Sequence, residues 1–184
     1  MSAEQQNKTF PAWDGAASTS LYQGTSLGPY HLDHRIAMAP LTRLRADNVT
    51  KVPGDQSAEY YAQRASKGGL IISEATIVSE QGGGFKGAPG IFSPEQVKVW
   101  KEINDGVHAK GGIIFCQIIF LGRVADPSTV KRVLAVSNIP AEKDSKTPLH
   151  VVDEEDLEVI LKEFKNAAEC CKEAGFDGIE LHGA

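Results

Sequence analysis

Short apolar runs alternate along the chain with longer segments in which apolar residues recur every three or four positions. The apolar runs cover residues 35–40, 70–72, 113–116 and 178–182. Runs that are this short and apolar at nearly every position are typical of strands buried on both faces of a sheet. We therefore expect four buried strands.

Three segments between these runs have the spacing of amphipathic helices. The pattern predicts helices over residues 56–66, 94–110 and 154–174. The second helix is the most clearly marked, because Ser93-Pro94-Glu95-Gln96 is a capping box with proline at the first helical position. Asp55 is expected to cap the first helix.

The alternation of strands and helices predicts an α/β fold in which helices cover a parallel sheet. Two architectures fit this order, a doubly wound sheet and a (β/α)₈ barrel. No G-x-G-x-x-G motif opens a helix after any strand, which weakens the doubly wound alternative. Outside these alternating strands and helices we expect a loose leader over residues 1–20, a hairpin within 22–32 and a long loop over 121–150.

Composition limits the kinds of partner that the chain can bind and the cellular compartment that it suits. The chain has 184 residues, which suits one domain, and its net charge of -5 leaves no basic stripe for nucleic acid. No apolar stretch is long enough for a membrane span or a secretory signal. The three cysteines do not resemble a disulfide framework, so we expect a reducing, cytoplasmic environment.

Candidate binding residues follow the predicted strands. In both architectures ligands bind at the carboxyl ends of the strands, where Pro40-Leu41-Thr42, Glu74-Ala75-Thr76, Gln117 and His182 stand. Gln117 is the most informative, because a buried amide needs hydrogen-bond partners. Thr42 fits the role of a loop cap equally well, and His182 fits an exposed position.

Two other kinds of site are disfavoured. Glu74, Asp126 and His182 lack the spacing of metal ligands, so we expect no metal site. Cys116 lies within a strand and no G-x-S-x-G motif is present, which leaves a serine or cysteine nucleophile without support.

Four motifs together resemble a known family. RIAMAPLTRLRAD, EYYAQRASKGGLIISEAT, IFCQ and AGFDGIELHGA occur in this order. Over residues 21–184 the chain is similar to the amino-terminal half of the old yellow enzymes, FMN-dependent ene reductases built on a (β/α)₈ barrel. It looks closest to the fungal members, including dehydrogenases of ergot-alkaloid pathways. The resemblance implies a TIM barrel truncated to about its first four strands.

The resemblance also implies roles for five residues at the flavin. Pro40, Leu41 and Thr42 would line the flavin ring, with the threonine hydroxyl bonded to a flavin carbonyl. Ala75 would pack beside the ring, where a small side chain lets the backbone approach. Gln117 would hold the pyrimidine edge.

For the substrate, the resemblance implies that His182 grips the carbonyl oxygen of an enal or enone, as an oxyanion hole does. The asparagine and tyrosine that follow this histidine in the family are not in the chain, and many members have tryptophan in place of Ile119. Barrel strands five to eight, whose last loops commonly bind phosphate, are also outside the sequence.

The function implied by the resemblance is reduction of activated alkenes by an FMN- and NADPH-dependent oxidoreductase. We expect the 184-residue chain to be inactive by itself, as a truncated member. The alternative is a non-catalytic half-barrel that pairs with another chain, or a pseudogene product. An open sheet would expose Ile36, Met38, Ile72, Ile114 and Leu181, and we expect self-association through its edges.

Overall fold

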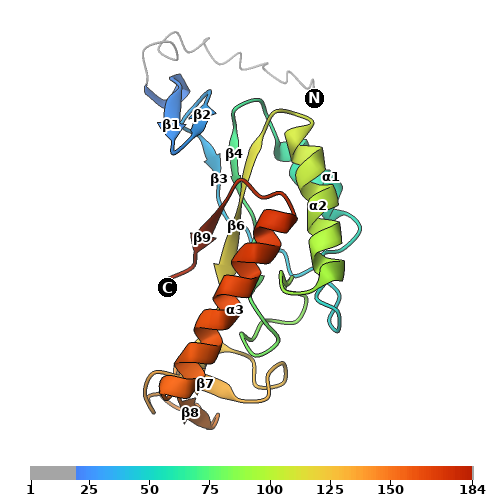
Figure 1. Ribbon diagram of the computed structural model, residues 1–184. Coiled ribbons are helices and arrows are strands. Elements are labelled where there is room, and N and C mark those ends of the chain that lie inside the picture. Colours follow the sequence, from blue (N-terminus) through green and yellow to red (C-terminus); the bar gives the residue numbers. More distant parts are fainter. Residues whose placement is uncertain (1–19, 184) are drawn as a thin grey trace, which may run out of the picture.

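The computed structural model describes residues 20–183 (Figure 1). The leader expected over residues 1–20 therefore lies outside the described residues, except for Ser20. No helix among the described residues is both long enough and apolar enough to cross a membrane.

A parallel sheet forms the centre of the structure (Figure 1). Its strands β3 (Ala37–Met38), β4 (Leu70–Ile72), β6 (Ile113–Ile119) and β9 (Gly178–Leu181) lie side by side in chain order. The short strand β5 (Thr76–Ile77) follows β4 and also pairs with β6. The prediction of four parallel strands in sequential order is confirmed, and β5 is an addition to it.

The strand β6 is the longest and pairs on both of its edges. One edge meets β4 and then β5, and the other edge meets β9. In this register Gln117 lies directly opposite Glu180. Partners in parallel strands project to the same face of the sheet, so these two side chains share one face.

Three helices pack on the sheet, and all three were predicted. They are α1 (Ser57–Arg64), α2 (Pro94–His108) and α3 (Glu154–Glu173). Capping boxes open α2 at Ser93 and α3 at Asp153.

The cap predicted for α1 is wrong. Gln56 occupies the cap position, and its side chain does not bond the helix. Asp55 lies inside a tight turn in which the Ser57 N–H donates to the Gly54 carbonyl at 2.9 Å. The turn places Asp55 one residue too early to reach the first helical N–H groups.

The main core lies between the helices and one face of the sheet. From β6, Ile114, Cys116 and Ile118 pack there against helical residues such as Trp100, which is fully buried. Because side chains alternate along a strand, Phe115 and Gln117 project to the opposite face, here termed the inner face. The expectation that an open sheet exposes Ile114 is therefore wrong.

Smaller elements surround the sheet. The predicted hairpin is present as β1 (Thr25–Leu27) and β2 (Tyr30–Leu32), after a short 3₁₀ helix, η2 (Ser20–Tyr22). The segment predicted as a long loop contains another 3₁₀ helix and two paired strands. These are η3 (Gly122–Val124), β7 (Val133–Ala135) and β8 (Leu149–Val151). A parallel pair of three-residue strands has too few positions to show a period in the sequence.

Candidate functional site

The carboxyl-terminal rim comprises the ends of β3, β4, β6 and β9 and the residues that follow them. Thr42 follows β3, Ala75 lies between β4 and β5, Gln117 is in β6, and His182 follows β9. Since the strands are parallel and adjacent, all four predicted residues stand at this one rim. Pro40 and Leu41 precede Thr42 on the same loop, and Leu41 is 53% exposed.

Gln117 is held firmly on the inner face. Its backbone N–H donates to Ser73 Oγ at 3.1 Å, and its side-chain Nε2 donates to Glu180 Oε1 at 2.7 Å. The residue is only 7% exposed. Within residues 20–183, the carbonyl oxygen of its side-chain amide accepts no hydrogen bond. A buried amide with an open acceptor suits a ligand that carries an N–H group.

His182 continues the pairing of β9 beyond the strand. Its backbone N–H donates to the Ile118 carbonyl at 3.0 Å. This bond fixes the histidine backbone beside the end of β6, and the side chain is half-buried. The backbone of His182 therefore holds the imidazole at the rim.

The loop that carries Thr42 is tied to the sheet by Glu74. The Arg43 backbone N–H donates to Glu74 Oε2 at 3.0 Å, and the neighbouring Leu44 N–H also favours the charged form of this carboxyl group. Burial raises the pKa of Glu74, while these N–H groups and the Arg43 charge act in the opposite direction. Glu74 therefore fixes residues that directly follow Thr42.

Tyr61 on α1 completes this attachment. Its ring is buried, and its hydroxyl oxygen accepts the Glu74 backbone N–H at 2.9 Å. Burial is the main cause that raises the pKa of Tyr61, and the nearby Glu74 charge adds to it. The phenol is therefore a neutral structural group that links α1 to the end of β4.

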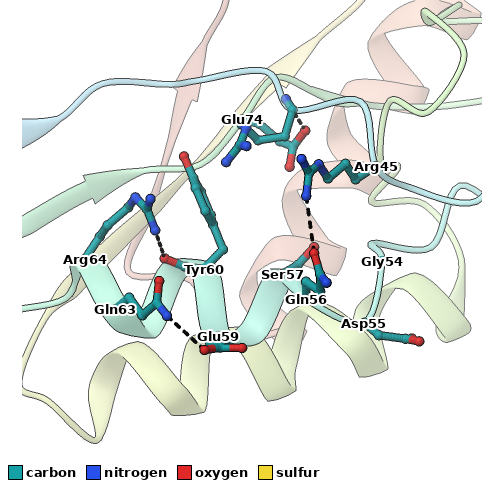
Figure 2. A pocket seen from close by; sticks show the side chains of 11 residues that line it. Arg45, Gly54, Asp55, Gln56, Ser57, Glu59, Tyr60, Gln63, Arg64 and Glu74 are labelled. Carbon is teal, nitrogen blue, oxygen red and sulfur yellow. Dashed lines mark hydrogen bonds between the residues drawn. The ribbon is translucent and has the colours of Figure 1, made fainter.

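A pocket of about 570 Å³ lies beside this attachment, between α1 and the loop after β3 (Figure 2). Arg43 and Arg64 place their guanidinium carbons 4.4 and 3.8 Å from the centre of the Tyr60 ring. Arg45 donates to Gln56 at 3.2 Å. None of the six residues predicted to bind flavin or substrate lines this pocket.

The inner face of the sheet is the better candidate for a cofactor than this pocket. The pocket carries three arginines and three acidic residues, and its arginines already contact groups of the protein. The Gln117 amide on the inner face instead keeps an open acceptor, as described above. Within the described part of the chain, no group of three His, Cys, Asp or Glu residues is placed to hold a metal ion.

Sequence reasoning did not assign the contacts of two carboxylates of the site. Glu74 is among the candidate residues at the predicted strand ends, but its hydrogen bond to the loop after Thr42 is not predicted. Glu180 gave no signal in the sequence, because its contact with Gln117 spans 63 positions. The contact between Gln117 and Glu180 becomes apparent only when the register of β6 and β9 is known. The contact of Glu74 becomes apparent only when β3 and β4 are known to lie side by side.

Comparison with known proteins identifies the family. Residues 20–184 match the model of the NADH:flavin oxidoreductase / NADH oxidase family. The chain is 39% identical over 175 residues to flavin oxidoreductase hxnT of Emericella nidulans, and covers 45% of that protein. It is 42% identical over 178 residues to 12-oxophytodienoate reductase 7 of Oryza sativa, again covering 45%. In both alignments 89% of this chain is matched.

A solved structure agrees with the sequence comparison. The old yellow enzyme from Pichia sp. superposes with a TM-score of 0.85 at 35% identity, over 90% of this chain and 46% of the Pichia chain. The chain thus spans about half the length of the relatives that it matches, and fungal and plant relatives match at similar identity. We conclude that the chain belongs to the NADH:flavin oxidoreductase / NADH oxidase family and folds as the corresponding part of an old yellow enzyme TIM barrel.

Proposed function

We propose that this chain forms the flavin-binding half of an FMN-dependent ene reductase that reduces α,β-unsaturated aldehydes and ketones with NADPH. The observation that carries this proposal is the Gln117 amide. It is buried on the inner face of the sheet, near the carboxyl-terminal rim, with an open acceptor. In barrels of this type, ligands bind at that rim.

The residues at the rim fit the ring system of FMN. Gln117 offers an acceptor and an N–H to its pyrimidine edge, and Thr42 offers a hydroxyl from the neighbouring loop. Pro40, Leu41 and Ala75 offer apolar or small side chains against its flat face. Leu41 is 53% exposed, which leaves apolar surface available for such a contact.

His182 would bind the substrate carbonyl at the same rim. When bound, FMN supplies the hydride that adds to the activated alkene. An imidazole N–H donated to the carbonyl oxygen stabilises the negative charge that develops on this oxygen. The hydrogen bond from its backbone to Ile118 limits how far the imidazole can drift from this position.

Two relatives support the choice of reductant and substrate. The chain is 44% identical over 170 residues to NADP-dependent oxidoreductase lnbE of Aspergillus flavus, whose name gives NADP as its coenzyme. The rice relative is, by name, a reductase of 12-oxophytodienoate. Since each relative is about twice as long as the matched region, the activity is proposed for a complete barrel.

A fusion protein tests this proposal. Residues 1–184 are joined to the carboxyl-terminal half of the Pichia old yellow enzyme, and flavin absorbance of the purified protein is recorded. We expect bound FMN, and NADPH oxidation that depends on added 2-cyclohexenone. A folded fusion protein without flavin would contradict the proposal.

Residues 1–184 alone are the matched control. We expect weak FMN binding and no turnover from them, because loops after the seventh and eighth strands commonly bind the phosphate in such barrels. Turnover by the control at the rate of the fusion protein would show that these residues suffice.

The second candidate is a half-barrel that pairs with another chain. Exposed apolar side chains on α3 and β9 favour it, since Leu161 is 69% and Leu181 is 65% exposed. The fusion protein described above separates the two candidates. A folded fusion protein that holds no flavin would favour pairing without catalysis.

A further inference from the structure

We propose that Glu180 is a positioning residue that fixes the orientation of the Gln117 amide for the pyrimidine edge of the flavin. This inference rests on the proposed function. Gln117 and Glu180 are opposite partners in the parallel pairing of β6 with β9. Gln117 Nε2 lies 2.7 Å from Glu180 Oε1, so the two side chains form a short hydrogen bond.

The hydrogen bond selects one of two orientations of the amide. The oxygen and nitrogen of a glutamine amide have nearly the same size, so a half-turn of the group changes its donors and acceptor but not its shape. A carboxylate only accepts hydrogen bonds, which makes Nε2 the favoured neighbour of Glu180. The amide oxygen must then face away from Glu180.

The selected orientation leaves a defined set of polar groups for a ligand. Within the described part of the chain, the Gln117 amide oxygen and its second N–H have no partner. They form an adjacent acceptor and donor. A flavin pyrimidine ring carries an N–H flanked by two carbonyls, so one N–H and one neighbouring carbonyl match this pair. Without Glu180, the amide would have to be ordered when the flavin binds.

A double-mutant cycle tests whether Glu180 acts through Gln117. The protein is the fusion described above, which contains the full chain, and the readout is the dissociation constant of FMN. We expect Glu180→Leu to weaken FMN binding about three- to tenfold. This is the range expected for one neutral hydrogen bond, here the one between the Gln117 amide and the flavin. In the Gln117→Ala background the same substitution should have almost no effect.

Two comparisons make the cycle specific. Riboflavin should lose affinity by the same factor as FMN, because Gln117 contacts the ring and not the phosphate. The matched control Glu169→Leu replaces an exposed glutamate on α3 and should leave both affinities unchanged. Equal losses from Glu180→Leu in both backgrounds, or no loss in either, would overturn the proposal. A folded wild-type fusion protein that binds no FMN would instead overturn the proposed function, and this inference with it.

A second measurement needs no cofactor and no fusion partner. In ¹⁵N-labelled residues 1–184, the two Gln117 Nε2 protons should have well-separated chemical shifts, because one of them faces Glu180. In Glu180→Leu the difference between the two chemical shifts should become smaller. Unchanged Nε2 shifts in this variant would contradict the orientation proposed for the amide.

Discussion

Glu74 links the strand end to the loop that carries Thr42, and its ionisation should be visible in the stability of the fold. Its ordinary pKa is 4.5, and burial raises it in the folded chain. The folded state therefore holds the proton more strongly than the unfolded chain. The stability gained from this is complete below the ordinary pKa and is lost as pH rises through the raised pKa.

Replacing Glu74 with glutamine tests this linkage. Glutamine places an N–H group against backbone donors, which should cost about 1–3 kcal/mol near pH 5. The difference in unfolding free energy between wild type and Glu74→Gln should shrink from pH 5 to pH 8, because only the wild type loses stability by deprotonation. Urea unfolding followed by tryptophan fluorescence measures it.

Glu59→Gln is the control for the Glu74 substitution. Glu59 is an exposed glutamate on α1, so its replacement should change neither the stability nor the pH dependence. A difference between wild type and Glu74→Gln that grows with pH would mean that the fold prefers the ionised carboxylate.

His182 and Gln117 should differ in what they bind. In the fusion protein, His182→Ala should lower turnover of 2-cyclohexenone about 10²-fold or more, the effect of losing one oxyanion donor, with little change in flavin content. Gln117→Ala should reduce the flavin content. Both are measured from flavin absorbance and NADPH oxidation. Equal loss of flavin in the two variants would contradict these roles.

The sequence predicted the positions of these residues better than their contacts. Gln117 and His182 could be placed at one rim, because parallel strands in sequential order bring their carboxyl ends together. The partners Glu74 and Glu180 could not be assigned, because a side-chain contact depends on the register of strands far apart in the chain.

At the scale of elements, the residues predicted to cap α1 and α2 should differ in their contribution to the unfolding free energy. Ser93 Oγ accepts the Gln96 N–H, and Gln96 Oε1 accepts the Ser93 N–H, at the start of α2. Ser93→Ala should lower the unfolding free energy by about 1 kcal/mol. Asp55→Ala, at the cap that the structure does not form, should change it by less than about 0.5 kcal/mol. Urea unfolding distinguishes the two, and equal losses would mean that Asp55 also caps its helix.

Element length explains what the sequence could predict. Helices α2 and α3 have 15 and 20 residues, enough for several turns of apolar periodicity and for recognisable caps. The strands β5, β7 and β8 have two or three residues each. Their pairing depends on neighbours supplied by the fold, so no local pattern indicates them.

At the scale of the whole molecule, residues 1–184 should associate in solution. Apolar side chains are exposed on the neighbouring elements α3 and β9, here termed the α3–β9 surface. Its members are Leu157 (47%), Leu161 (69%), Ile179 (41%) and Leu181 (65%). Of the residues that we expected an open sheet to expose, Ile36 and Leu181 are exposed, whereas Ile72 and Ile114 are buried and Met38 packs partly buried against the main core.

Substitutions on the α3–β9 surface test this association. Sedimentation velocity of residues 1–184 should show species that grow with concentration, because apolar surface and a bare strand edge favour contact between copies. Leu161→Glu with Leu181→Glu should shift the protein toward monomer. Val49→Glu is the control, since Val49 is 85% exposed but lies in a loop elsewhere. A monomeric wild type at all concentrations would contradict the prediction.

The pairing of β6 with β9 also determines when the sheet can be completed during synthesis. Gln117 and Glu180 are 63 positions apart, so a ribosome needs about 3–13 seconds to make the second after the first, at 5–20 residues per second. Throughout this interval β4 and β5 are the native partners of β6 that have already been made. Its other edge remains open to any extended segment nearby, so the nascent chain is exposed to incorrect strand pairing until β9 has been made.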